Sequence, residues 1–357
     1  STETASAAST ETASAASTET ASAASTETAS ATSTETASAA STETGSANFI
    51  KIGSTMSTET ESTISTDTTE ELETQLTNET EECTCGVSTL DDDNRLSTRV
   101  VGGSLSTPHS HPWQALLHYY QLPVCSATLI NDLYVLTAAH CIFMMTDFQR
   151  RIEKKYPNKV LNANGSVDFN KVSVVLAAYD TTNLTDTETV GVESFVVHPQ
   201  HRVNHVHDTH DLAVMRLSRR VRYTPHIQPV CLPAQGEQFS GEWGLVVGWG
   251  QTEFNGSRSR YLKQAKVRIL ADSLCVKSKI GKYFKDSPES MICAYQYKTD
   301  ACKGDSGGPL LYRASDFYIQ AGIVSWGIEC AKVGYPGVYT EVSAYADWIR
   351  NNSLDAK

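Results

Sequence analysis

The chain has 357 residues, of which 40% are apolar, and its formal net charge is −12. Residues 1–82 hold 15 acidic side chains against a single basic one, Lys51, so the acidity belongs to this segment and the rest of the chain is nearly neutral. The near-neutral body argues against nucleic acid as a partner, which would need a concentrated basic face, and no apolar run approaches the roughly 18 residues that span a bilayer.

The first 82 residues are of low complexity. Over 1–48 the unit STETASAA recurs six times with small variations, and Ser, Thr and Glu still dominate as far as Glu82. The unit offers little apolar area to offset the roughly 1–2 kcal/mol that ordering each residue's backbone costs. We therefore expect a disordered tail over 1–82, and its Ser and Thr content is typical of an O-glycosylated, mucin-like stalk.

Several features favour secretion to the extracellular space. The nine cysteines are confined to residues 83–330, and outside the cell such cysteines are normally oxidised in pairs. The chain starts at Ser1 rather than Met, which we interpret as the loss of a signal peptide. Five sequons could accept glycan in the secretory pathway, at Asn78, Asn164, Asn183, Asn255 and Asn351.

From residue 100 onward the sequence is typical of short strands. Branched and aromatic runs are separated by Gly, Pro, Asn and Asp, as in ATLINDLYVL, KVSVVLAAY, ESFVVH, LAVMRL, GLVVGWG, AKVRIL and YIQAGIVSWG. Only the end is predicted to be helical, because Val342, Tyr345, Trp348 and Ile349 fall three to four residues apart in EVSAYADWIRNN. The pattern predicts an all-β fold and leaves open whether it is a barrel or a sandwich.

Three segments carry candidate catalytic residues. LTAAHC contains His140, HDLAVMRL contains Asp211 and DACKGDSGGPL contains Ser306. A serine hydroxyl is a poor nucleophile near neutral pH, so it needs an adjacent base, and a neutral His oriented by a buried carboxylate supplies one. Asp211 directly precedes the apolar run LAVM, which is expected to bury it beside the core.

The strings TAAHC and GDSGGP, in the order His, Asp, Ser, resemble the trypsin-like serine proteases of the chymotrypsin family over residues 100–357. The resemblance implies two antiparallel six-stranded β-barrels with a C-terminal helix. It also implies that Ser306 attacks the scissile carbonyl, that His140 takes the proton and that Asp211 holds the imidazole tautomer. The backbone N–H groups of Gly304 and Ser306 would form the oxyanion hole. This chemistry needs no cofactor and no metal.

The stretch RVVGG resembles the family's activation site. Cleavage after Arg99 would free the amino group of Val100, which would pair with Asp305 and order the oxyanion loop. The resemblance therefore divides the chain into the tail (1–82), a cysteine-containing pro-segment (83–99) and a catalytic domain (100–357). We expect the uncut chain to be a zymogen.

The resemblance also implies a specificity pocket for basic side chains. Asp300 would lie at its floor, and Gly327 and Gly337 would keep it open. Ala301 stands where many trypsins have Ser, and loss of that hydroxyl weakens an ammonium contact more than the forked contact of a guanidinium. We expect cleavage after Arg in preference to Lys. The extended substrate would pair along Ser325, Trp326 and Gly327.

The family's disulfides imply specific cysteine pairs. Cys231 would tether the pro-segment by a disulfide to Cys83 or Cys85, and the sequence does not decide between these two partners. One cysteine then remains, and it could be free, capped or bonded to another chain. The other expected pairs are Cys125–Cys141, Cys275–Cys293 and Cys302–Cys330.

Some residues depart from the family pattern. Glu329 stands where Gly is usual and Lys303 where Gln is common, so both could narrow specificity or obstruct the pocket. The segment between Cys141 and Lys171 is longer than in a simple trypsin and contains the basic run RRIEKKYPNK. A histidine-rich run suggests zinc, but its HxHxxH spacing matches no established zinc pattern, so we expect no metal at His201, His205, His207 and His210.

The sequence thus predicts a secreted serine endopeptidase with a restricted substrate range. Its expected partners are protein substrates with Arg or Lys at the cleaved position, an activating trypsin-like protease and protein protease inhibitors. Two alternatives stay open. One is a catalytically weak or inactive homologue that acts as a binding or matrix protein, and the other is a digestive protease of broad range.

Overall fold

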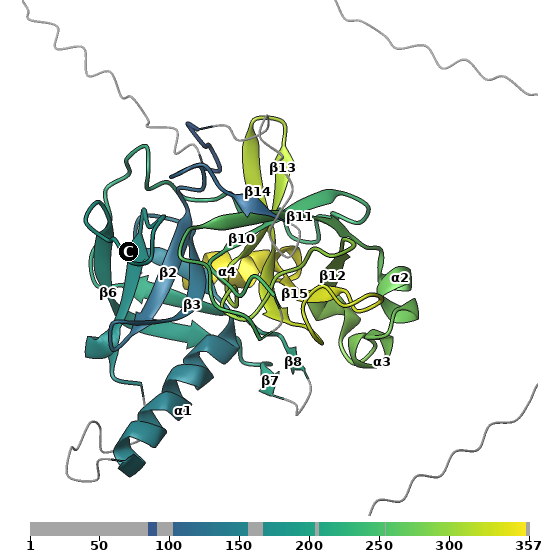
Figure 1. Ribbon diagram of the computed structural model, residues 1–357, viewed down its shortest axis with the longest axis horizontal. Helices are drawn as coiled ribbons and strands as arrows, with labels where there is room; N and C mark the ends of the chain where they lie inside the picture. Colours follow the sequence, from purple (N-terminus) through teal and green to yellow (C-terminus); the bar gives the residue numbers. More distant parts are fainter. Residues whose placement is uncertain (1–84, 91–102, 156–166, 204–206, 254, 355–357) are drawn as a thin grey trace, which may run out of the picture. The chain divides into compact units, whose positions relative to one another are not determined.

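The computed structural model describes residues 85–90, 103–155, 167–203, 207–253 and 255–354. The tail 1–82, Cys83, the activation site at Arg99 and Val100, and the sequons at Asn78 and Asn164 lie outside the described residues. The described residues fold into two closed antiparallel barrels, which confirms the predicted fold class. Figure 1 shows the first barrel in blue and teal and the second in green and yellow.

The first barrel closes in the order β2-β3-β4-β9-β6-β5. All six residues of β2 are buried, so both faces of this strand are covered by protein. β4 pairs with β9 through Thr137 and Ala213, which brings the segment before His140 beside the segment after Asp211. The strands are β2 (Gln114–Tyr119), β3 (Leu122–Leu129), β4 (Tyr134–Thr137), β5 (Val172–Leu176), β6 (Glu188–Val197) and β9 (Ala213–Leu217).

The second barrel follows the order β11-β10-β13-β14-β15-β12 and closes where β12 returns to β11. In β11, buried Val267 and Ile269 alternate with exposed Lys266 and Arg268, as expected for a strand with one face in a core. A short strand, β1 (Ser104–Leu105), adds to the outer edge of β11. The barrel strands are β10 (Trp243–Gly248), β11 (Lys263–Ile269), β12 (Met291–Tyr295), β13 (Pro309–Ala314), β14 (Phe317–Trp326) and β15 (Gly337–Glu341).

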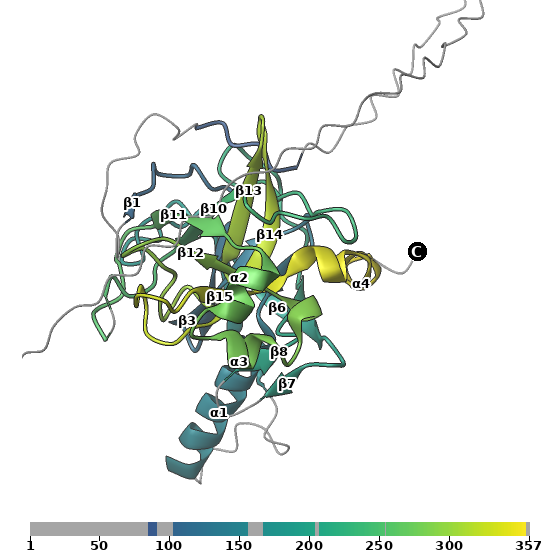
Figure 2. The same ribbon diagram turned by 90° about the vertical axis from the view of Figure 1, so that its right-hand side faces the viewer.

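The predicted C-terminal helix is present as α4 (Ala346–Asn352), preceded by a 3₁₀ turn over Val342–Tyr345. Within this segment Val342, Tyr345 and Ile349 are buried, so the expected apolar face packs into the core. Two short helices, α2 (Asp272–Lys277) and α3 (Gly281–Phe284), lie beside β12 and are shown in Figure 2. The remaining 3₁₀ turns span Phe169–Lys171 and Pro288–Ser290.

The expectation that only the C-terminus is helical is wrong. α1 (Ala139–Lys155) is a helix of 17 residues that holds His140 in its first turn and runs outward from the first barrel (Figures 1 and 2). Ile142, Met145 and Gln149 are buried at helical spacing, whereas Phe143 and Met144 are exposed. These two exposed apolar residues break the apparent periodicity of the sequence, so pattern alone missed the helix.

Candidate active site

His140 and Asp211 form a hydrogen-bonded pair in the described structure. His140 lies at the start of α1, and Asp211 lies in the short link between β8 (Asp208–Thr209) and β9. The Nδ1 atom of His140 is 2.7 Å from Oδ2 of Asp211, and the backbone N–H of His140 donates to Oδ1 at 2.8 Å. The two contacts fix both the position and the tautomer of the imidazole, which leaves Nε2 as the proton acceptor.

The charges of this pair stabilise each other. Burial by itself would raise the pKa of Asp211, but the charge and hydrogen bonds of His140 outweigh it and lower the pKa to about 2. Burial would likewise lower the pKa of His140, but the neighbouring Asp211 carboxylate holds it above its ordinary value. The carboxylate is therefore ionised at neutral pH and stabilises an imidazolium when one forms.

Two hydroxyl groups of the second barrel hold Asp211 in place. Ser325 donates its Oγ–H to Oδ2 of Asp211 at 2.5 Å, and Thr340 donates its Oγ1–H to the Asp211 carbonyl at 2.7 Å. The sequence predicted a role for Ser325 only in pairing with the extended substrate, and it did not indicate Thr340 as a site residue. No sequence signal could have found these contacts, because the partners are more than 100 positions apart.

Ser306, the predicted nucleophile, lies where the two barrels meet. The backbone N–H of Ser126, in β3 of the first barrel, donates to the carbonyl of Ser306 at 2.8 Å. The backbone around the serine requires glycine, since Gly304 has φ +107° and Gly307 has φ +78°. A Cβ on Gly307 would also lie 2.5 Å from the Ser126 carbonyl oxygen. The sharp turn of the GDSGGP string thus places Ser306, which is half-buried, between the barrels.

A cavity of about 220 Å³ opens beside Ser306. Asp300 is only 8% exposed there, and its Oδ2 accepts a hydrogen bond from the backbone N–H of Ala331 at 3.0 Å. Burial raises the pKa of Asp300 to about 7. A cation that enters this cavity would find a poorly solvated carboxylate. The lining includes Asp300, Ala301, Ser306, Ser325, Trp326, Gly327 and Gly337.

The two predicted pocket glycines border this cavity in different ways. A Cβ on Gly337 would lie 2.5 Å from Oδ1 of Asp300, so any side chain there would crowd the carboxylate. A Cβ on Gly327 would meet no protein atom within 4 Å and would instead project into open space. Glu329 and Lys303 also line the cavity, and Glu329 pairs with Lys332 at 2.6 Å.

Asp305, next to the catalytic serine, points away from the cavity into the protein interior. Its Oδ1 accepts a hydrogen bond from Gly250 N–H at 2.7 Å, and its Oδ2 accepts one from Cys302 N–H at 2.9 Å. Burial raises the pKa of this carboxyl group. A small void beside it is lined by Lys263 and Gln264 of β11, the two residues with which β1 pairs.

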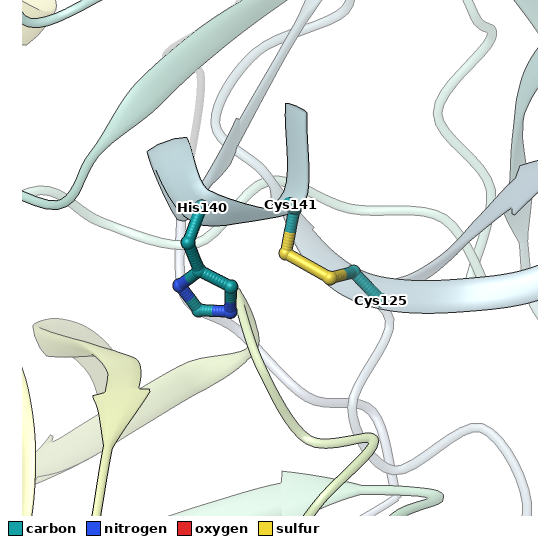
Figure 3. A group of neighbouring side chains, drawn as sticks. All are labelled: Cys125, His140 and Cys141. Carbon is teal, nitrogen blue, oxygen red and sulfur yellow. A yellow bond between two sulfur atoms is a disulfide. The ribbon is translucent and has the colours of Figure 1, made fainter. Parts of the chain in front are cut away.

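The described part of the chain contains four disulfides, and three of them are Cys125–Cys141, Cys275–Cys293 and Cys302–Cys330. The fourth joins Cys231 to Cys85 and so decides between Cys83 and Cys85, the two partners that the sequence left open. Figure 3 shows Cys125–Cys141 beside the His140 imidazole, joining β3 to the first turn of α1. Its sulfur atoms are bonded to each other, so this cluster offers no thiolate for a metal.

The histidine-rich run disperses in the fold. Nε2 of His207 lies 3.2 Å from Oδ2 of Asp286, and Nδ1 of His210 lies 2.6 Å from the Tyr345 hydroxyl. His205 lies outside the described residues. The HxHxxH spacing therefore does not bring its described members, His207 and His210, to a common metal.

The sequons at Asn183, Asn255 and Asn351 are all exposed. Among the described residues, no helix is both long and apolar enough to cross a membrane.

Comparison with known proteins agrees with this geometry. A family model described as Trypsin matches residues 100–349. The hepatocyte growth factor activator serine protease of Homo sapiens is 34% identical over 265 residues, which cover 72% of this chain and 37% of that protein. CLIP domain-containing serine protease B10 of Anopheles gambiae is 34% identical over 287 residues, 75% of this chain and 72% of that protein. Venom serine protease 34 of Apis mellifera is 30% identical over 288 residues, 77% of this chain and 62% of that protein.

The two barrels, the hydrogen-bonded His140–Asp211 pair and the half-buried Ser306 between the barrels are the arrangement of a trypsin-type serine protease domain. The chain belongs to the trypsin family. It spans little more than a third of the length of the hepatocyte growth factor activator relatives that it matches.

Proposed function

We propose that this protein is a secreted zymogen that is activated by cleavage after Arg99 and then hydrolyses peptide bonds after Arg, in preference to Lys, in a restricted set of proteins. The proposed preference for basic side chains rests on Asp300, whose buried carboxylate lines the cavity beside Ser306. A basic side chain would neutralise it, whereas an apolar one would leave a buried charge unpaired at a cost of about 3–5 kcal/mol.

The preference for Arg rests on Ala301, which lines the same cavity without a hydroxyl. A guanidinium can bind a carboxylate through two parallel hydrogen bonds, whereas an ammonium relies on several separate acceptors. Loss of one acceptor therefore weakens a Lys substrate more than an Arg substrate.

Activation is supported by the position of β1, the first described strand after Arg99. β1 begins at Ser104, four residues after Val100, and pairs with the residues of β11 that border Asp305. Four extended residues reach about 14 Å, and we infer that a new amino terminus at Val100 would enter the void beside this carboxylate. A buried ammonium and carboxylate would neutralise each other and hold the adjacent oxyanion backbone of Gly304 and Ser306 in its active form.

Cys85–Cys231 would keep the pro-segment and tail attached after cleavage. The other disulfides and the exposed sequons at Asn183, Asn255 and Asn351 suit a secreted glycoprotein. Relatives named as a growth factor activator and as a venom protease fit a selective enzyme better than a digestive one. Selectivity would come from Glu329 and Lys303 at the pocket and from α1. Protein inhibitors and an activating protease are the further partners that we infer.

The test compares Ser306 reactivity before and after cleavage. The full chain is cut with a protease specific for Arg99–Val100, the new terminus is sequenced, and both forms are treated with a fluorophosphonate probe. We expect strong labelling of the cut form only, and none of an Arg99→Gln chain given the same treatment. Equal labelling of intact and cut protein would refute the zymogen proposal.

A further inference from the structure

A groove of about 280 Å³ lies on the second barrel, over the neighbouring strands β11, β10, β13 and β14 (Figure 1). We call it the β10–β11 groove. Its lining shares no residue with the cavity beside Ser306, so the proposed catalysis does not account for it. Trp243 of β10 lines the groove and is 42% exposed. Aromatic side chains of this kind are common anchors of binding surfaces.

The groove is rich in positive charge. The Lys266 ammonium lies 5.3 Å from the centroid of the Trp243 ring, and the guanidinium carbon of Arg268 lies 5.2 Å from it. In the described part of the chain, neither of these two cations forms an ion pair. Arg313 also lines the groove, and of the described lining residues only Glu242 is acidic. The surface therefore suits an anionic ligand.

The chain that precedes Cys85 is attached beside this groove. Cys85 is bonded to Cys231. The next residue, Gly86, donates its N–H to the Pro229 carbonyl at 2.7 Å and accepts the Tyr318 N–H at 2.8 Å. Tyr318 is itself a lining residue of the groove. A disulfide and two hydrogen bonds thus fix the point of attachment next to the groove.

The residues just before Cys85 are acidic. The stretch TNETEE, residues 77–82, contains Glu79, Glu81 and Glu82 and no basic residue. Three to six extended residues reach about 10–20 Å, so these carboxylates can reach the groove from their attachment point. A short tether also raises the local concentration of the segment to the millimolar range, which makes weak contacts effective.

We propose that the β10–β11 groove is the docking site of residues 77–82, whose Glu79, Glu81 and Glu82 carboxylates bind the cations around Trp243. A guanidinium can bind a carboxylate through two parallel hydrogen bonds, which favours acids over other polar residues here. The docked segment would cover the groove without entering the cavity beside Ser306. The inference goes beyond the proposed function and requires neither activation nor catalysis.

Chemical labelling of Lys266 tests the contact in the uncut, full-length chain. Brief acetylation with an N-hydroxysuccinimide ester at low salt, followed by digestion and mass spectrometry, gives the rate for each lysine. Lys266 should react at least about threefold more slowly in the parent than in Glu79→Gln/Glu81→Gln/Glu82→Gln, the size of effect that a few tethered surface ion pairs can produce. The substitutions keep the sequon at Asn78 intact.

Three controls separate docking from a general effect of charge. Lys277, which is exposed on α2, should react equally in both chains. The variant Glu3→Gln/Glu11→Gln/Glu19→Gln loses the same charge at the far end of the tail and should keep Lys266 protected. Salt at about 1 M, where the Debye length is about 3 Å, should abolish the protection in the parent.

A second measurement follows the aromatic anchor of the groove. The contribution of Trp243 to acrylamide quenching is the difference between each chain and its Trp243→Phe form. Trp243 should be quenched more strongly in the chain with Glu79, Glu81 and Glu82 replaced by Gln than in the parent. The change in quenching should vanish in high salt, as the protection of Lys266 does.

Three outcomes would overturn the proposal. Equal rates for Lys266 in the parent and in the chain with the three Gln substitutions would show that the segment does not dock. Protection that disappears on dilution would assign the groove to a second copy of the chain. Protection that appears only with an added sulfated polysaccharide would assign it to an external polyanion. Because no step needs cleavage after Arg99, this proposal and the zymogen proposal can fail independently.

Discussion

The hydroxyl of Ser325 donates to the carboxylate of Asp211 at 2.5 Å, so a strand of the second barrel holds a buried acid that precedes β9 of the first. The acceptor is ionised at neutral pH, because the pKa of Asp211 is lowered to about 2. The contact is therefore a charge-assisted hydrogen bond between barrels, and its strength can be measured.

Ser325→Ala is expected to lower the free energy of unfolding by about 1.5–3 kcal/mol, the range for hydrogen bonds to charged groups. Thr340→Val is the matched comparison, because it removes a hydroxyl that donates to a neutral carbonyl of the same residue. That change should cost about 0.5–1.5 kcal/mol. Urea denaturation at neutral pH measures both values. A loss in Ser325→Ala no greater than in Thr340→Val would contradict the assignment.

Asp300 makes inhibitor binding depend on pH. The pKa of its carboxyl group is raised to about 7 by burial, and only the ionised form attracts a cation. As the pH falls below 7, a growing fraction of free protein carries neutral Asp300, so the affinity for benzamidine should fall about tenfold per pH unit. Inhibition constants of cut protein between pH 5 and 8 test this. Asp300→Asn should bind weakly with a flat profile, and a flat profile in the parent protein would count against the role of Asp300.

Ala301→Ser should shift the preference between Arg and Lys. The added hydroxyl gives an ammonium a further hydrogen-bond partner, and one bond to a charged group, at about 1.5 kcal/mol, corresponds to roughly tenfold in kcat/KM. We expect about that gain for Lys peptides and a change of less than about threefold for Arg peptides of matched sequence. Equal gains for both substrates would show that the hydroxyl does not discriminate between them.

The Asp305→Asn variant should be cleaved after Arg99 but should not become fully active. The variant is expected to be cut after Arg99 normally, yet its kcat should be about 100 to 1,000 times lower, the usual loss for a missing oxyanion-hole donor. Asp316→Asn, at an exposed turn between β13 and β14, is the control and should retain full activity. Normal turnover by the cut Asp305→Asn variant would contradict the proposed pairing of the Val100 amino group with Asp305.

The Cys85–Cys231 disulfide predicts how the tail behaves after cutting. On a gel without reductant, the cut chain should migrate as one species, and with reductant it should separate into tail and catalytic domain. The double variant Cys85→Ser/Cys231→Ser should separate without reductant. Release of the tail from the unaltered protein under non-reducing conditions would mean that the tether does not form.

Much of the fold and the candidate site could be predicted from local strings. TAAHC and GDSGGP identify a histidine and a serine whose surroundings are set within a few residues, because the turn at Ser306 depends on its own glycines. The strands followed from alternation and turn residues. α1 could not be predicted as readily, because Phe143 and Met144 remain exposed on a helix that extends outward from its barrel.

By itself, the sequence determined the catalytic residue types, the resemblance that links them, and the contrast between an acidic repeat and a cysteine-containing body. Only the folded chain shows that Cys231 pairs with Cys85, that Ser325 and Thr340 bind Asp211, and that His201 lies near the carboxylates of Asp208 and Asp211. The physical reason is the range of the interactions. Turns, strand alternation and glycine conformations are set by neighbours in the chain, whereas these contacts join separate elements and exist only once the barrels have closed.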